Sequence, residues 1–318
     1  LRGVSPLQIE GFFTTLLEPI TSGLGRTICC KRAGVSTVTI SSPRNRSGLA
    51  GVVALVLTPF DEGGAVLWDA FRAHVDWQLS MGVQGLFAVC GSGEMAALSL
   101  EERLRLARIA VERAGGVPVI ATANLERGLD RNLDELKAME DTGVRGVVLV
   151  GPGRRGEEIP PAVDYFARLA EAASCDVYLY EWPSALPRHI KPEEDAYLVS
   201  RCGIRGIKDT TCTTEGIAAK VMAAPDSAVF QANTPLLPQA IRAGAKGVMA
   251  TTSTAAADLV VRYWEIASSD PASPEADELH RKLVFLDLLL RRGHPAVAKH
   301  LATMRGCPMP VRCRTAIE

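Results

Sequence analysis

A regular alternation that begins at Gly51 constrains the fold more than any other feature of the sequence. Eight short apolar runs are each followed by a longer stretch, several with a clear amphipathic helical pattern. Continuous apolar runs are typical of strands buried on both faces, and the alternation is typical of βα units around a parallel sheet. The eight runs span residues 51–57, 85–90, 117–123, 146–150, 176–180, 203–208, 228–232 and 246–251.

Eight such units predict a (β/α)8 TIM barrel, because the repeating part is close to the ~250 residues typical of that fold. A doubly wound open sheet is the alternative, but it should carry a glycine-rich dinucleotide turn after its first strand. The turn here reads TPFDEGG and contains no G-x-G-x-x-G. We therefore expect a barrel over residues 49–268 and a C-terminal helical segment over 269–318, with helices near 271–292 and 294–305.

Residues 1–48 do not share this periodicity. They contain only two acids and end in the polar stretch SSPRNRSG. Richness in arginine and hydroxyl residues is typical of an organellar transit peptide. A wrongly assigned translation start and a poorly ordered extension are the alternatives, and we leave the segment out of the fold prediction.

Composition argues against several classes of function. The formal net charge of −1 offers no electrostatic footprint for nucleic acid or a membrane surface, and no apolar run approaches the ~20 residues needed to cross a bilayer. The eight cysteines form no C-x-x-C pair, and the five histidines show no metal-binding spacing. We predict reduced thiols, a cytoplasmic protein, and neither metal nor cofactor, and we interpret His294 and His300 as helix-surface residues.

The lysines point to a possible nucleophile. In a barrel of this kind catalytic residues lie at the carboxyl ends of the strands, and of the eight lysines only Lys208, in the stretch GIRGIKDTT, holds such a position. Period-2 alternation places Lys208 on the same face as Gly206, pointing inward. Lys31 lies in the extension and Lys246 at the amino end of a strand. The others fall in or beside predicted helices, where a solvated lysine needs no explanation: Lys137, Lys191, Lys220, Lys282 and Lys299.

An amine inside an apolar barrel loses the hydration of its charged form, so we expect the pKa of Lys208 to fall below the usual ~10.4. A neutral amine is a nucleophile for a ketone or an aldehyde. The protonated Schiff base that results is an electron sink, which allows a neighbouring C–C or C–O bond to break. The alternative is an ion pair between Lys208 and Asp209 at the barrel rim.

Two other strand ends suit this chemistry. Tyr180 ends the run that neighbours the Lys208 strand, and a phenol near an imine can relay protons, although an aromatic core residue is the common alternative. After the second run, Gly91, Ser92 and Gly93 offer backbone N–H groups and one hydroxyl. Such a loop is a candidate cradle for a carboxylate, or simply a turn.

Together these motifs are similar to those of the dihydrodipicolinate synthase/N-acetylneuraminate lyase family, in the same order and spacing over residues 49–310. The resemblance implies a (β/α)8 barrel with extra C-terminal helices, a homo-oligomer (dimer or tetramer), and a lysine Schiff base with pyruvate or another 2-oxo acid. The motifs are TPF at 58–60, CGSGE at 90–94, YEWP at 180–183 and GIKDTT at 206–211.

Carried over by residue, the resemblance implies that Lys208 forms the Schiff base, that Tyr180 is the strand-five tyrosine, and that Gly91, Ser92 and Gly93 form the loop that binds the 2-oxo acid carboxylate. Two further residues at strand ends are substrate-binding candidates. These are Thr58 after the first strand and Met249 in the eighth.

The sequence also departs from the synthase pattern. The first hydroxyl of the loop is replaced by Gly91, and the P-Y-Y segment common after strand four is Pro152-Gly153-Arg154. In the synthases these two missing groups complete a proton relay with the strand-five tyrosine. The asparagine of Y-N-x-P is Glu181, and the arginine that follows that motif is missing. The imine-forming residues are therefore present without the residues that recognise aspartate semialdehyde.

We therefore expect a class I lyase that acts on a 2-oxo acid of the pyruvate or 2-keto-3-deoxy sugar acid type, and not a true dihydrodipicolinate synthase. A dehydratase or deaminase that uses the same imine, and a barrel without catalysis that keeps a binding or structural role, are the alternatives. Arg154 is a candidate for holding a distal carboxylate or is a solvated loop residue. Glu181 is a candidate second acid or base beside Tyr180, or bonds to the loop backbone.

Overall fold

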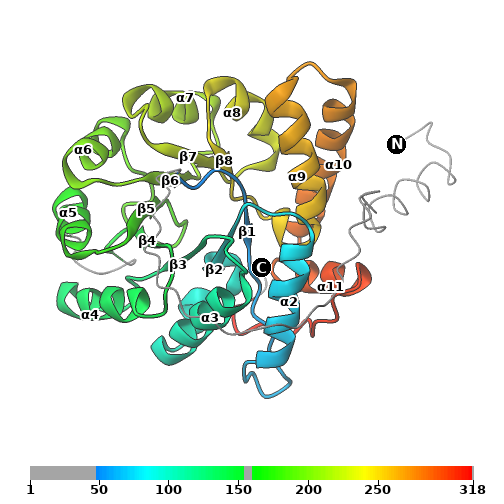
Figure 1. The fold of residues 1–318 in the computed structure, drawn as a ribbon, viewed down its shortest axis with the longest axis horizontal. Helices are drawn as coiled ribbons and strands as arrows, with labels where there is room; N and C mark the ends of the chain where they lie inside the picture. Colours follow the sequence, from blue (N-terminus) through cyan, green and yellow to red (C-terminus); the bar gives the residue numbers. More distant parts are fainter. Residues whose placement is uncertain (1–47, 154–159, 317–318) are drawn as a thin grey trace, which may run out of the picture.

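The computed structural model describes residues 48–153 and 160–316 of the 318-residue chain. Eight parallel strands close into a barrel in chain order, with β8 pairing back to β1, and this confirms the predicted (β/α)8 fold (Figure 1). The strands are β1 (Gly51–Leu55), β2 (Gly85–Val89), β3 (Val119–Thr122), β4 (Gly146–Val150), β5 (Asp176–Tyr180), β6 (Gly206–Asp209), β7 (Ala228–Gln231) and β8 (Gly247–Val248).

Helices surround the barrel, and three of them, α9, α10 and α11, lie on one side of it (Figure 1). The helix α3 begins at a capping box in which the Ser99 hydroxyl accepts from the Glu102 N–H and the Glu102 carboxylate accepts from the Ser99 N–H. The helices are α2 (Trp68–Ser80), α3 (Leu100–Arg113), α4 (Leu129–Glu140), α5 (Ala162–Ala172), α6 (Pro192–Cys202), α7 (Thr214–Ala223), α8 (Leu237–Ala243), α9 (Ser253–Ser269), α10 (Pro274–Leu290) and α11 (Ala296–Met304).

The sixth strand begins later than its apolar run. The run starts at Gly203, but this residue has a φ of 71° and closes helix α6 in the left-handed conformation that favours glycine. The strand therefore starts at Gly206 and extends through Asp209. At Gly206 a Cβ would come within 2.4 Å of the Ala228 carbonyl oxygen, so only glycine fits beneath Lys208 in this register.

The strands are apolar because both of their faces are covered. Every residue of β1, β2 and β4 is buried, with the outer face packed by the helices and the inner face filling the barrel. Aromatic rings from β2, β5 and β7 meet inside, where Tyr178 packs edge-to-face on Phe230 at 6.3 Å between ring centroids. The interior is thus a packed core, and an active site is expected at the carboxyl ends of the strands.

Two expectations from the sequence concern residues outside the described part of the chain: the nature of residues 1–47, and the role of Arg154. Within residues 48–153 and 160–316, no helix is long and apolar enough to cross a membrane. In the same residues no group of three or more histidine, cysteine, aspartate or glutamate side chains is arranged to hold a metal ion.

Candidate active site

Lys208 lies at the carboxyl end of β6 with only 4% of its surface exposed. It stands in register with Tyr180 on β5 and with Phe230 on β7. Its Nζ is 4.3 Å from the centroid of the Tyr180 ring and 5.7 Å from that of Phe87. Burial among these rings lowers the pKa of Lys208 to about 8, against a smaller opposing effect of Cys90.

The amine of Lys208 has no carboxylate partner within the residues that the structure describes. Asp209, which directly follows it, points its carboxylate elsewhere: Oδ1 accepts from the Nζ of Lys220 at 3.2 Å and from the N–H of Thr211 at 2.9 Å. The ion pair between Lys208 and Asp209, the alternative from the sequence, is therefore not formed. Lys208 keeps the depressed pKa that burial gives an unpaired amine.

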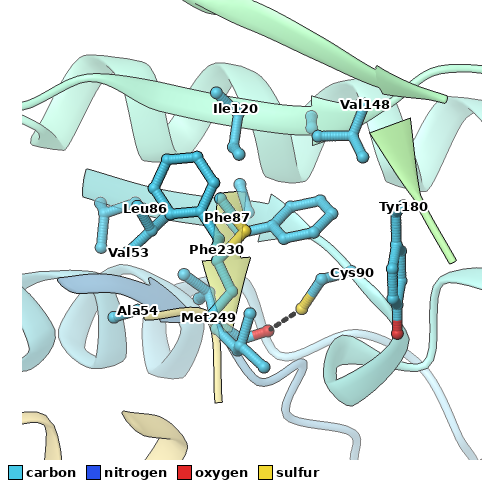
Figure 2. Close-up of a cluster of buried hydrophobic side chains, with 14 of the residues drawn as sticks. Val53, Ala54, Leu86, Phe87, Cys90, Ile120, Val148, Tyr180, Phe230 and Met249 are labelled. Atoms are coloured by element: carbon cyan, nitrogen blue, oxygen red, sulfur yellow. Dashed lines mark hydrogen bonds between the residues drawn. The ribbon is translucent and has the colours of Figure 1, made fainter. Parts of the chain in front are cut away.

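Apolar side chains line the barrel below the amine. Figure 2 shows Phe87, Phe230 and Met249 packed together, with Cys90 and Tyr180 beside them. Met249 is 2% exposed and its backbone N–H donates to the carbonyl of Gln231. The thiol of Cys90 donates to the carbonyl of Val56 at 3.7 Å.

Tyr180 presents its phenol beside the loop that follows β2. Its ring packs edge-to-face on Phe87 at 6.1 Å, and burial raises the pKa of its hydroxyl, which therefore stays protonated at neutral pH. A Cβ added at Gly91 would lie 3.2 Å from the Tyr180 hydroxyl oxygen. The backbone of the loop therefore approaches the phenol closely at the position where the synthases carry a hydroxyl residue.

We use the term substrate loop for residues 90–94. Gly91–Gly93 form a single 3₁₀ turn, and the Thr58 hydroxyl donates to the carbonyl of Gly93 at 2.7 Å. The N–H of Ser92 points to the thiol of Cys90. Within the described part of the chain, the Gly91 N–H donates to no carbonyl or side-chain oxygen, and no hydrogen bond of the Ser92 hydroxyl is found. Two donors are thus available on one short loop, while Thr58 holds the loop in place.

Glu94 anchors the substrate loop to the C-terminal part of the chain. Its Oε1 pairs with the Nζ of Lys299 at 2.7 Å, and its Oε2 accepts from the N–H groups of Arg314 and Thr315. Burial raises the pKa of Glu94, but its bonds to Lys299 and Thr315 outweigh burial and bring that pKa below its usual range. The sequence interpretation of Lys299 as solvated is wrong, because its side chain is fully buried in this ion pair.

Glu181 is held in a second buried ion pair, behind the ends of β5 and β6. Its Oε1 accepts from the Nζ of Lys220 at 2.7 Å and from the N–H of Ile190, and its Oε2 accepts from the N–H of Thr210. Both side chains of the ion pair are buried, so Lys220, like Lys299, is not the solvated residue expected from its place in a helix. The occupied oxygens of Glu181 favour a structural bond to the loop over acid–base work.

Asp195 lies in the same buried space. Neither of its carboxylate oxygens has a hydrogen-bond partner within the described residues. Burial raises its pKa to about 6, with Lys220 opposing and with Glu181 and Asp209 adding to the rise. The cluster thus holds three acids around one lysine, and Asp195 is the acid without a hydrogen-bond partner in the described chain.

The sequence interpretation of His294 is wrong. His294, interpreted as a helix-surface residue, has both ring nitrogens buried, and Lys208 is among the charges that act on it. A local signal was available, since Gly293 before it and Pro295 after it indicate a turn between two helices rather than a helix surface. His300, by contrast, is exposed on α11 as expected.

These features define a class of protein: a (β/α)8 barrel with a buried lysine that has no carboxylate partner in the described chain at the end of strand six, a tyrosine beside it and a short glycine-rich loop next to that tyrosine. The sequence matches the model of the dihydrodipicolinate synthetase family over residues 48–317, and the chain belongs to this family. The resemblance seen in the sequence is thereby confirmed. Family membership supports a lyase acting on pyruvate-type substrates.

Individual relatives are distant. A DapA-like lyase of Halobacterium salinarum, described as uncharacterized, is 29% identical over 262 residues, which cover 81% of this chain and 85% of that protein. The 4-hydroxy-tetrahydrodipicolinate synthase of Brucella abortus is 33% identical over 172 residues, which cover 54% of this chain and 58% of the synthase.

Solved structures share the fold. YagE of E. coli K12, a member of the dihydrodipicolinic acid synthase family solved in complex with pyruvate, has a TM-score of 0.76 at 23% identity, over 83% of this chain and 91% of YagE. The dihydrodipicolinate synthase of Acinetobacter baumannii, also with pyruvate, has a TM-score of 0.76 at 22% identity, over 84% and 92% of the two chains. At these identities the likeness concerns the fold alone.

Proposed function

We propose that the protein is a lyase that binds a 2-oxo acid as a Schiff base on Lys208 and cleaves the C3–C4 bond of that acid, C2 being the imine carbon. One observation carries the proposal: the Nζ of Lys208 is buried at the barrel mouth against Tyr180 and has no carboxylate partner among the described residues. A pKa of about 8 keeps a useful fraction of the amine neutral at physiological pH, and the neutral amine is the nucleophile.

The substrate loop supplies the binding site for the carboxylate of the 2-oxo acid. The N–H of Gly91 and the hydroxyl of Ser92 are free to donate to it. Hydrogen bonds to a charged acceptor are about twice as strong as neutral ones, so these two both anchor and orient the acid. The keto carbon is then directed toward the amine across the mouth.

Tyr180 supplies the proton transfers of imine formation. The neutral amine attacks C2, and the phenol donates a proton to the departing oxygen so that water leaves and the iminium forms. Because its pKa is raised, the phenol holds this proton until the carbinolamine needs it. The phenolate then takes the proton of the C4 hydroxyl, C4 becomes a carbonyl carbon and the C3–C4 bond breaks. The iminium accepts the electron pair of that bond, so an aldehyde leaves and the enamine of pyruvate remains on Lys208.

The substrate class follows from what the site lacks. Gly91 leaves Tyr180 without the hydroxyl that completes the synthase relay, and Glu181 and Pro183 to Ala185 replace the residues that hold aspartate semialdehyde. A 2-keto-3-deoxy sugar acid, which carries its own hydroxyl groups, fits such a site better. In this proposal Arg154 remains the predicted partner of a distal polar group, and a homo-oligomer remains the predicted assembly.

The proposal is tested by trapping the imine. We expect wild-type protein incubated with pyruvate and cyanoborohydride to gain one reduced adduct per chain, measured by intact-protein mass spectrometry. Lys208→Ala should gain none, whereas Lys246→Ala, which removes an exposed lysine at the opposite end of the barrel, should label like the wild type. Equal labelling of Lys208→Ala, or no adduct on the wild type, would contradict the proposal.

A further inference from the structure

Residues 312–315, which follow α11, bond directly to the substrate loop, and we call them the C-terminal strap. The N–H groups of Arg314 and Thr315 donate to Oε2 of Glu94 at 2.7 and 2.8 Å, and the Thr315 hydroxyl donates to the same oxygen at 2.9 Å. Three donors of the strap thus converge on one buried carboxylate oxygen. Glu94 is the residue at which the strap and the substrate loop are joined.

The guanidinium of Arg314 fixes the strap to the surrounding loops. Nη1 and Nη2 each donate to an oxygen of Glu102 at 2.7 Å. Nη1 also donates to the carbonyl of Ala97 at 3.0 Å, and Nε donates to the carbonyl of Gly64 at 2.8 Å. A planar guanidinium can make all of these bonds together, whereas the ammonium group of a lysine cannot. Arg314 therefore connects the loop after β1, the residues after the substrate loop and the start of α3.

Two cations of this network enclose the ring of Phe60, the last residue of the TPF motif. The Nζ of Lys299 lies 4.7 Å from the ring centroid and the Cζ of Arg314 lies 4.6 Å from it. The Lys299 Nζ also donates to Oε1 of Glu94 at 2.7 Å and to the carbonyl of Arg312 at 2.6 Å. Each of the two cations is paired with a carboxylate, so the network supplies position rather than net charge.

Glu94 passes this restraint to the donors of the substrate loop. Its N–H donates at 3.0 Å to the carbonyl of Gly91, which belongs to the peptide between Gly91 and Ser92. Glu94 has a φ of 61° and a ψ of 34°, a left-handed conformation that residues other than glycine rarely adopt. Such a conformation persists where the surrounding structure holds it. The strap therefore supports both candidate donors to the carboxylate, the Gly91 N–H and the Ser92 hydroxyl.

We propose that Arg314 is a positioning residue for the carboxylate of the 2-oxo acid, because through Glu94 it holds Gly91 and Ser92 in the arrangement that binds this group. The inference rests on the proposed function and extends the substrate site to the strap. Two donors must stay aligned with one carboxylate, so a displaced loop loses affinity. Arg314 acts through the loop and not on the reacting atoms, so the reactivity of Lys208 does not depend on it.

The test separates affinity from reactivity in the full-length protein. The rate of imine trapping by cyanoborohydride is measured against pyruvate concentration, which gives a half-saturating concentration and a rate at saturation. The variants are Arg314→Ala, Arg314→Lys and the milder Thr315→Val, which loses only the hydroxyl bond to Glu94. Arg312→Ala is the matched control, because Arg312 is an exposed arginine of the same strap.

We expect Arg314→Ala to raise the half-saturating pyruvate concentration about tenfold, the scale of one hydrogen bond to a charged group, with the rate at saturation within twofold of the wild type. Arg314→Lys and Thr315→Val should each raise it about threefold, and Arg312→Ala should not change it. A role in stability alone would reduce the amount of folded protein and the rate at saturation, but would leave the half-saturating concentration unchanged.

A double variant tests whether Arg314 acts through Glu94. Glu94→Gln keeps the shape of the side chain and removes the charge that binds the strap. If both residues belong to one path, Arg314→Ala/Glu94→Gln should raise the half-saturating concentration no further than the stronger single variant does. Effects that multiply in the double variant would show that Arg314 acts by another route and would overturn the inference.

A half-saturating concentration that stays at the wild-type value in both Arg314→Lys and Thr315→Val would also overturn the inference, even if Arg314→Ala does not fold. In that case the Schiff base on Lys208 would stand. A wild-type protein that forms no adduct at all would instead contradict the proposed function itself.

Discussion

Two lysines twelve residues apart, Lys208 and Lys220, are both buried, yet their surroundings differ in one respect. Lys208 faces the barrel mouth among aromatic rings and has no carboxylate within bonding distance in the described chain. Lys220 lies behind the barrel wall and pairs with Glu181 at 2.7 Å and Asp209 at 3.2 Å. The difference shows that an amine becomes a candidate nucleophile when burial is combined with the absence of a counter-charge.

The paired lysine also positions the unpaired one. Glu181 follows Tyr180, and Asp209 follows Lys208, so the ion pairs of Lys220 tie together the ends of the two strands that carry the candidate catalytic pair. The Glu181 N–H donates to the Lys208 carbonyl at 3.3 Å, and the Thr210 hydroxyl donates to the Glu181 carbonyl at 2.5 Å. The carboxylates of Glu181 and Asp209 are thus held away from the amine of Lys208.

Removing the positive charge of Lys220 should have the largest effect on stability. Lys220→Met leaves Glu181 and Asp209 buried without their cation, and breaking a buried pair in this way costs about 3–5 kcal/mol. The free energy of unfolding in urea measures the loss. The double variant Lys220→Met/Glu181→Gln should recover part of it, and a loss below about 1 kcal/mol in the single variant would mean that the pair contributes little.

The unpaired lysine should instead make stability depend on pH. The folded pKa of Lys208, about 8, lies below its ordinary value of 10.5. Below pH 8 the Lys208 amine is protonated in both the folded and the unfolded protein, and the folded protein bears the full cost of the buried charge. Between pH 8 and 10.5 only the unfolded protein keeps this proton, so the free energy of unfolding rises with pH.

Lys208→Met should remove that dependence. The free energy of unfolding of Lys208→Met should exceed that of the wild type most at pH 7. This difference should shrink by up to about 3 kcal/mol toward pH 10.5, because each unit of pKa shift corresponds to about 1.36 kcal/mol. Denaturant unfolding at a series of pH values gives the difference between the two proteins. An advantage that stays constant with pH would show that Lys208 titrates normally.

Tyr180→Phe should slow turnover about 100-fold, the lower end of the range for a lost general acid. The variant keeps the ring that packs on Phe87, so the fold and the pKa of Lys208 should change little. Tyr197→Phe is the matched control, because Tyr197 is 51% exposed on α6. Equal turnover rates in the wild type, Tyr180→Phe and Tyr197→Phe would show that the Tyr180 hydroxyl takes no part in the reaction.

Ser92→Ala should have the smallest effect. One donor to the carboxylate is lost while the N–H of Gly91 remains, so affinity for pyruvate should fall about tenfold, or roughly 1.4 kcal/mol. Because the Ser92 hydroxyl bonds to no described residue, the melting temperature should not move. Unchanged affinity for pyruvate would place the carboxylate elsewhere in the mouth.

The sequence predicted the fold well because strand position depends on local pattern. The runs at 146–150 and 176–180 coincide with β4 and β5, and the pairing of Tyr180 with Lys208 follows from the order of strands in a barrel. The alternation that identified the eight strands requires no knowledge of distant contacts.

The sequence failed where contacts are distant. Lys220 and Glu181 are 39 residues apart, and Lys299 and Glu94 are 205 apart, so no local pattern predicts either ion pair. A weaker signal existed in α7, where Lys220 follows the buried Ile217 by three residues and so shares its helix face. His294 is a different case, because Gly293 and Pro295 on either side of it were a local signal for a turn.

The central claim concerns which amine reacts and in which charge state, and one measurement addresses both. Wild-type protein is trapped with pyruvate and cyanoborohydride from pH 6 to pH 10.5, and the labelled peptide is identified by mass spectrometry. The account predicts a label on Lys208, none on Lys220 or Lys299, and a trapping rate that rises with pH and levels off near pH 8. A rate that still rises tenfold per pH unit beyond pH 9, or a label on either paired lysine, would contradict it.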